Sequence, residues 1–109
     1  MPKYTPGEMI LLSFPFTDAL RKKQRPALVI ADTDDEDVVV ARISSQVKQT
    51  KYDFEIGDWE KAGLLLPFIV RIDKIATIQK DNVVKKLGKL SVDEMIKVRY
   101  LLANLFVEA

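Results

Sequence analysis

The pattern of apolar and polar residues predicts several short strands in the first half of the chain. Residues 9–14 form an apolar run, and residues 26–31 form a second run after a polar, cationic segment. Residues 38–43 are rich in β-branched side chains, which favour strands. Apolar runs of this length between turn residues indicate strands buried on both faces. We expect three neighbouring strands in a meander, the second beginning at Pro26, because proline cannot donate to a ladder.

The second half of the chain predicts shorter strands. In residues 52–56, aromatic and aliphatic side chains alternate with two carboxylates, which is the period of a half-buried strand. Residues 57–63 have room for one helical turn ended by a glycine. Residues 67–70 and 72–78 are apolar stretches separated by Arg71, and we interpret them as the last two strands.

A terminal helix is predicted from about Ser91. Ser91 and Glu94 have the spacing of a capping box, in which each side chain binds the other residue's backbone N–H. Apolar residues then recur at helical intervals, at Met95, Val98, Leu102 and Leu105. The fold class that follows is mainly β: a small, strongly bent antiparallel sheet or partly open barrel, with a C-terminal α-helix covering one side.

Length and composition indicate a single globular domain over residues 1–109. Apolar residues make up 48% of the 109-residue chain and charged residues 30%, which is ordinary for a folded protein. No apolar run approaches the roughly 20 residues of a membrane-spanning helix, and the N-terminus lacks the apolar core of a secretory signal. We therefore expect a cytoplasmic protein that does not enter a membrane.

The absence of two residue types narrows the possible chemistry. The chain has no cysteine, which excludes disulfides, thiolate zinc sites and thiol nucleophiles. It has no histidine, which excludes the commonest general base and the Ser-His-Asp triad. Catalysis would have to use the remaining polar side chains, and we expect neither a metal nor another cofactor.

Cations are concentrated although the formal net charge is only +1. Residues 21–25 hold four cations, and residues 48–51, 71–74 and 85–89 are also basic, whereas residues 32–37 are acidic. If the basic segments meet on one face, a nearly neutral protein can still bind phosphate there.

The order of several segments resembles the PemK and MazF family of toxins from toxin–antitoxin systems. These segments are GEMILLSFPFTD, RKKQRPALVIAD, VARISSQ, GLLLPFIVRIDKIATIQ and KKLGKLS, and the most specific parts are RPALVI and ISSQ. The resemblance implies a small SH3-like barrel, a homodimer, and metal-independent endoribonuclease activity on single-stranded RNA, held in check by a cognate antitoxin.

The resemblance also implies site residues. The arginine of the RP pair and a hydroxyl residue before the glutamine form the family's cleavage centre, and these positions are Arg25 and Ser44 here. Counting from Gln46 selects Ser44, but the adjacent Ser45 remains an alternative. The substrate would be held by neighbouring polar residues and cations, namely Arg21, Lys22, Lys23, Ser45, Gln46 and Lys48.

Such chemistry suits an enzyme without histidine, because RNA supplies its own nucleophile, the 2′-hydroxyl. The protein has to align that hydroxyl and stabilise the charge that develops on the phosphoryl oxygens. A guanidinium is suited to this task, since its donors match phosphate geometry. The acceptor of the 2′-hydroxyl proton stays open among Glu8, Asp18, Asp53, the substrate itself and water, and no RNA recognition sequence follows from the chain.

Two alternative functions remain open at this point. A toxin of the same barrel fold can poison a topoisomerase without cleaving RNA, and fold alone does not decide between these activities. A degenerate family member could serve only to bind an antitoxin. The paired RPALVI and ISSQ segments favour the nuclease, because a toxin that acts only by binding would not need them.

Overall fold

The computed structural model describes residues 2–15, 22–45 and 50–108, with the backbone alone for Phe14, Pro15 and Lys22. This part of the chain forms six strands, one 3₁₀ turn and one α-helix. Their bounds are β1 Glu8–Pro15, β2 Lys22–Ala31, β3 Asp37–Ser44, β4 Asp53–Glu55, β5 Ile69–Gln79, η1 Lys80–Asn82, β6 Val83–Lys89 and α1 Val92–Glu108.

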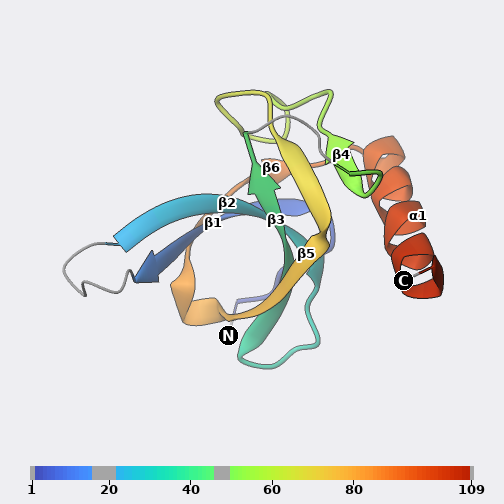
Figure 1. The fold of residues 1–109 in the computed structure, drawn as a ribbon. Helices are drawn as coiled ribbons and strands as arrows, with labels where there is room; N and C mark the ends of the chain where they lie inside the picture. The colour runs from blue at the N-terminus through green and yellow to red at the C-terminus, as the bar shows by residue number, and fades with distance from the viewer. Residues whose placement is uncertain (1, 16–21, 46–49, 109) are drawn as a thin grey trace.

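The strands form one antiparallel sheet in the order β4-β5-β3-β2-β1-β6. The sheet curls strongly but does not close, and α1 lies outside it beside β4 and β5 (Figure 1). The predicted fold class, a strongly bent antiparallel sheet with a C-terminal helix, is therefore confirmed. The predicted meander is also confirmed, because β1, β2 and β3 are successive neighbours.

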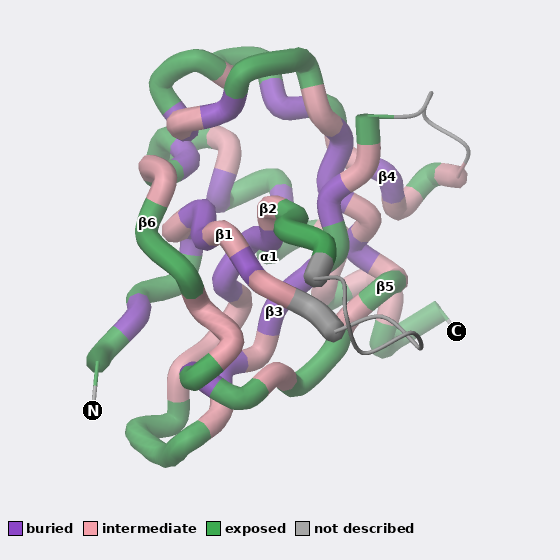
Figure 2. The backbone as a smooth tube through the Cα atoms, turned by 90° about the vertical axis from the view of Figure 1, so that its left-hand side faces the viewer, coloured by how far each residue is buried: buried purple, intermediate pink, exposed green. Residues whose placement is uncertain are grey.

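Both faces of the central strands are buried, and this explains their continuous apolar runs. Met9 and Leu28 belong to a core on the side of α1, which also includes Met95 and Val98 of the helix. The alternate residues of the same strands face a second apolar cluster, formed by Tyr4, Ile10, Leu12, Ala27, Val29, Val38 and Val40. Buried residues accordingly gather in the middle of the molecule, whereas β6 is largely exposed or intermediate (Figure 2).

The predicted start of the second strand is wrong, because β2 begins at Lys22 and Pro26 lies within it. The ladder between β2 and β1 extends to Pro15↔Lys22, whereas the ladder between β2 and β3 ends at Ala27↔Arg42. Pro26 thus sits where β2 loses one of its two neighbours, and a missing N–H is tolerated at such a place. Beyond this point β1 and β2 project from the sheet as a two-stranded ribbon (Figure 1).

The prediction of two last strands separated by Arg71 is also wrong. Residues 69–70 of the first stretch and all of the second belong to the single strand β5. Its pairing with β3 jumps from Ala41↔Ile75 to Arg42↔Arg71, so that residues 72–74 form a bulge. The last strand is β6, which pairs with β1 at the edge of the sheet. It escaped prediction because three of its seven residues are lysines and no apolar alternation marks it.

The terminal helix agrees with the prediction, but only one of the two bonds of the predicted capping box forms, because the Glu94 carboxylate accepts from the Ser91 hydroxyl and the Gly57 N–H instead of the Ser91 N–H. The Ser91 hydroxyl accepts a hydrogen bond of 3.1 Å from the Glu94 N–H, and Glu94 also accepts one of 2.9 Å from the Gly57 N–H. The predicted single turn lies just before Gly63, where the Ala62 N–H donates to the Asp58 carbonyl. No helix in the described residues is long and apolar enough to span a bilayer.

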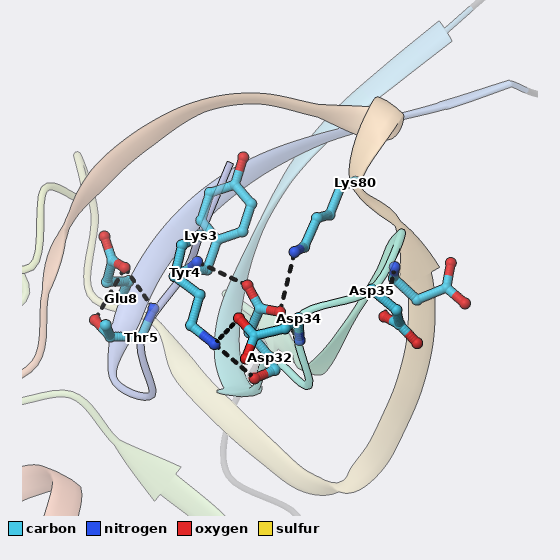
Figure 3. A network of polar contacts seen from close by, with 9 residues as sticks. Lys3, Tyr4, Thr5, Glu8, Asp32, Asp34, Asp35 and Lys80 are labelled. Atoms are coloured by element: carbon cyan, nitrogen blue, oxygen red, sulfur yellow. Dashed lines mark hydrogen bonds and ion pairs between the residues drawn. The ribbon is translucent and has the colours of Figure 1, made fainter. Parts of the chain in front are cut away.

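The acidic turn between β2 and β3 is tied into the fold (Figure 3). Asp32 is buried and accepts hydrogen bonds from the N–H groups of Tyr4 (2.8 Å) and Asp34 (2.9 Å). The buried ammonium of Lys80, from η1, lies 3.0 Å from the same carboxylate. The pKa of Asp32 lies well below its usual range, and the largest cause is the hydrogen bond from the Tyr4 N–H. The Asp34 N–H and the Lys80 ammonium lower this pKa further, whereas burial opposes them.

Candidate active site

A cavity of about 580 Å³ opens where β2 and β3 separate. Its apolar wall comes from the second cluster and the neighbouring part of β5, including Leu12, Ala27, Val40, Ala76 and Ile78. Its charged side chains come from three strands: Lys23 and Arg25 from β2, Arg42 from β3, and Asp73 and Lys74 from the β5 bulge. The cavity thus combines four cations with one carboxylate.

Arg25, the residue predicted to lie at the cleavage centre, is among the residues that line this cavity. It is exposed, pairs with Leu12 of β1 across the ladder, and lines the cavity beside Lys23. No ion pair joins Arg25 to another residue of the described part of the chain. Its guanidinium is therefore available to an anion that enters the cavity.

Ser44 lies at the end of β3 and does not line the cavity. It is two residues beyond Arg42, so alternation places both on the same face of β3. Ser45 follows at an exposed position. The structure therefore brings Arg25 and Lys23 together, with Ser44 beyond the cavity on the neighbouring strand.

Several predicted substrate-binding residues lie outside the part of the chain that the structure describes. These are Arg21, Gln46 and Lys48, together with the side chain of Lys22, whose backbone pairs with Pro15. Their proposed roles remain predictions.

Two residues of the cavity were missed by the sequence interpretation. Arg42 is the one cation in the otherwise apolar strand segment VVVARI, and its isolation is the feature of the sequence that could have marked it as a functional residue. Asp73 lies in the β5 bulge, and its Oδ1 atom is buried without a hydrogen-bond partner among the described residues. A buried acceptor without a partner costs about 1–3 kcal/mol, so a ligand that donates to it would be stabilised.

The carboxylates considered as proton acceptors are placed very differently. Glu8 lies 3.2 Å from the Lys86 ammonium. Burial raises the pKa of Glu8, but hydrogen bonds from Thr5 and the charge of Lys86 outweigh it, so that the pKa is lowered. Asp53 is buried 3.4 Å from Arg71, although alternation had put it on the polar side of its strand. Asp18 lies outside the described residues.

The basic segments meet only in part at the cavity. Lys23, Arg25 and Lys74 come from two of them, whereas Lys86 lies beside Glu8 and the ring of Tyr4. Lys51 forms an ion pair with Glu108 at the end of α1. Among residues 2–15, 22–45 and 50–108, no three acidic side chains gather into a group that could hold a metal ion.

Comparison with known proteins agrees with this architecture. The chain is similar to the solved structure of an endoribonuclease in complex with its cognate antitoxin from a mycobacterial species, with a TM-score of 0.79, 19% identity and 98% of each chain covered. It is also similar to the Mycobacterium tuberculosis toxin MazF-mt6, with a TM-score of 0.73, 21% identity, and 92% of this chain and 96% of that chain covered. It is also similar to the MazE–MazF complex of Deinococcus radiodurans (0.78, 17%, 98% of this chain and 100% of that one). These likenesses establish the fold.

No curated protein sequence matches the chain significantly. The sequence model described as the PemK-like, MazF-like toxin of type II toxin–antitoxin systems matches residues 5–106, which is nearly the whole chain. The bent sheet, the terminal helix and this match together lead to one assignment: the chain belongs to the family of PemK-like and MazF-like toxins of type II toxin–antitoxin systems.

Proposed function

We propose that this protein is a toxin that acts as a metal-independent endoribonuclease, cutting single-stranded RNA with some sequence selectivity in the cytoplasm. The observation that carries the proposal is the cavity at the β2–β3 fork, into which Arg25 opens without an ion-pair partner among the described residues. Four cations around one cavity favour a phosphate chain as the substrate.

Arg25 would stabilise the scissile phosphate. As the 2′-hydroxyl oxygen attacks phosphorus and the bond to the 5′-oxygen breaks, negative charge grows on the non-bridging oxygens. A guanidinium stays protonated and offers paired donors to those oxygens. Ser44 would donate a further hydrogen bond to a substrate lying across the end of β3, outside the cavity wall.

Asp73 is the best-placed proton acceptor among the described carboxylates. Asp73 lines the same cavity as Arg25, and its Oδ1 forms no hydrogen bond with any described residue, whereas Glu8 and Asp53 are each held by a cation. In this scheme Asp73 takes the 2′-hydroxyl proton and water protonates the leaving 5′-oxygen. The products are a 2′,3′-cyclic phosphate and a 5′-hydroxyl end.

A cognate antitoxin is the protein partner in this proposal. Two of the similar structures contain a toxin together with its antitoxin. A disordered acidic antitoxin segment would be attracted to the cationic cavity and would exclude RNA from it.

A homodimer is the expected assembly, and α1 offers a surface for it. Val92, Ile96, Tyr100 and Val107 fall on one side of the helix and are all exposed, Val107 by 83%. We call these four residues the outer stripe. A groove of about 610 Å³ runs beside it, between α1 and β4. The stripe carries no charge, so a second copy of the same stripe, packed across a two-fold axis, suits it better than a charged tail.

The alternative is a toxin that acts by binding alone. The same cationic cavity would then hold an acidic protein segment without cutting RNA. The buried acceptor of Asp73 favours the nuclease, because an acidic partner would place a further carboxylate beside it.

The proposal is tested by incubating the purified protein with an unstructured RNA in the presence of a chelator. We expect cleavage with 2′,3′-cyclic phosphate ends, and we expect Arg25→Ala to lower kcat by about 10²–10³, since it removes a preorganised charge-stabilising donor. Arg99→Ala, which removes an exposed arginine of α1, is the matched control and should cleave normally. Loss of cleavage with chelator, or full activity of Arg25→Ala, would contradict the proposal.

A further inference from the structure

Arg42 is placed unusually for a cation in a central strand. The preceding residues on its face of β3, Val38 and Val40, are both buried in the second apolar cluster. Arg42 continues their row, yet it is exposed and lines the cavity at the β2–β3 fork. Its side chain therefore leaves the apolar row where the cavity opens.

The charges around Arg42 are not balanced within the fold. Across the sheet Arg42 pairs with Ala27 on one side and with Arg71 on the other. Like charges at directly opposed positions destabilise a sheet. Asp53 lies 3.4 Å from Arg71 and is fully buried, whereas no ion pair joins Arg42 to any described residue.

Arg42 and Arg25 open into the same cavity from neighbouring strands. Ala27↔Arg42 is the last pair of the β2–β3 ladder, and Arg25 lies two residues beyond it, where the strands separate. Diagonal neighbours inside a ladder are about 7–8 Å apart, so the separation of these two positions is at least of that order. Arginine side chains are long enough to reach two different groups across that spacing. Arg25 and Arg42 can therefore hold two phosphates of one chain rather than compete for a single one.

We propose that Arg42 binds a phosphate of the RNA backbone next to the scissile phosphate. The inference rests on the proposed function and adds a second anion site to it. Arg71 is paired with Asp53, and an RNA phosphate would supply the counter-charge that Arg42 lacks among the described residues. Since this contact exists before and during the reaction, Arg42 acts in substrate binding and Arg25 acts mainly in the transition state.

The test separates binding from cleavage. The dissociation constant of an uncleavable oligonucleotide, with 2′-O-methyl groups throughout, is measured by fluorescence anisotropy at several salt concentrations. We expect Arg42→Ala to weaken binding about tenfold, as for loss of a hydrogen bond to a charged group. The slope of log affinity against log salt should fall in magnitude by about 0.7, the value for one phosphate of a single strand.

Steady-state cleavage provides the second readout. Arg42→Ala should raise KM by a similar factor and leave kcat within about threefold of the wild-type value. Arg42→Lys keeps the charge and should recover most of the binding and the salt slope. Arg99→Ala, an exposed arginine on α1, should change neither quantity.

The possible failures can be told apart. Wild-type salt slope and affinity in Arg42→Ala would overturn the inference, and so would a loss confined to kcat. If the wild-type protein binds the oligonucleotide through Arg42 but cleaves no RNA, Arg42 is a phosphate-binding residue and the proposed nuclease function fails. Circular dichroism of Arg42→Ala verifies its fold, and Arg42→Gln repeats the measurement if the alanine variant is unstable.

Discussion

Arg25 and Asp73 carry opposite charges in one cavity, and no ion pair joins them. If they were bound to each other, the guanidinium could not face a phosphate and the carboxylate could not accept a proton. Their separation keeps a cation and a base available to the same ligand. A ligand that fills the cavity against its apolar side chains would exclude water and so strengthen its interactions with Arg25 and Asp73.

The Asp73→Asn substitution tests the role of the base. Asparagine has nearly the same shape but cannot accept a proton, so we expect kcat to fall by about 10²–10⁴ while KM changes little. Single-turnover cleavage under saturating enzyme measures the chemical step. Asp81→Asn, which alters an exposed carboxylate of η1, should behave as the wild type. An Asp73→Asn protein that cleaves at the normal rate would exclude Asp73 as the base.

At the scale of elements, α1 has two apolar sides with different partners. Met95 and Val98 are buried against the sheet, whereas the outer stripe faces away from it. A helix that is apolar on two sides and exposed on one of them indicates an interaction surface. For a domain of this size, burying that side would add to a limited core.

The Ile96→Glu substitution tests the outer stripe. A carboxylate at the centre of a self-packed apolar surface would be desolvated next to its symmetry mate, so we expect a monomer of 12.4 kDa in place of a dimer of twice that mass. Sedimentation velocity measures this change. Ile96 is 55% exposed, and the variant should therefore stay folded. Lys61→Glu, on an exposed loop, is the charge control and should remain dimeric. A monomeric wild-type protein would refute the dimer.

At the scale of the whole molecule, the Asp32–Lys80 pair connects parts that are distant in sequence. It joins the N-terminal segment, the end of β2 and the 3₁₀ turn before β6, and its two side chains are buried. Removing one partner of a buried pair leaves the other charge uncompensated, which is strongly destabilising. The acidic turn thus helps to keep the curled sheet together.

This pair predicts a pH dependence of stability. The pKa of Asp32 is lowered in the folded state, so the folded protein binds fewer protons there than the unfolded chain does. The contribution of ionised Asp32 to the free energy of unfolding is therefore complete above the ordinary aspartate pKa of 3.8, and it is lost progressively as the pH falls below that value. We expect Asp32→Asn to lower the Tm at pH 7 and the difference from wild type to shrink at pH values below about 4.

Thermal unfolding followed by circular dichroism between pH 7 and pH 3 measures this difference. Asp58→Asn alters an exposed carboxylate outside the network and should give the same Tm as the wild type at each pH. A Tm difference for Asp32→Asn that stays constant over the range would show that the carboxylate charge contributes nothing.

The site was predictable only in part. Arg25 could be selected only because the RPALVI and ISSQ segments together resemble the toxin family, and the structure places it in the cavity with Lys23. Arg42 and Asp73 could not, since their importance depends on which residues lie opposite them in β2 and β5. The roles of Ser44, Ser45, Arg21, Lys22, Gln46 and Lys48 stay predictions.

Features of the fold that have local causes could be predicted from the amino-acid pattern alone. Apolar runs specify β1, β2 and β3, and the Ser91–Glu94 cap specifies the start of α1, because these signals act between residues close along the chain. The edge strand β6, the continuity of β5 and the burial of Asp53 became evident only in the folded chain. These depend on long-range pairing and register, which set the neighbours of each side chain and leave no signature in a single segment.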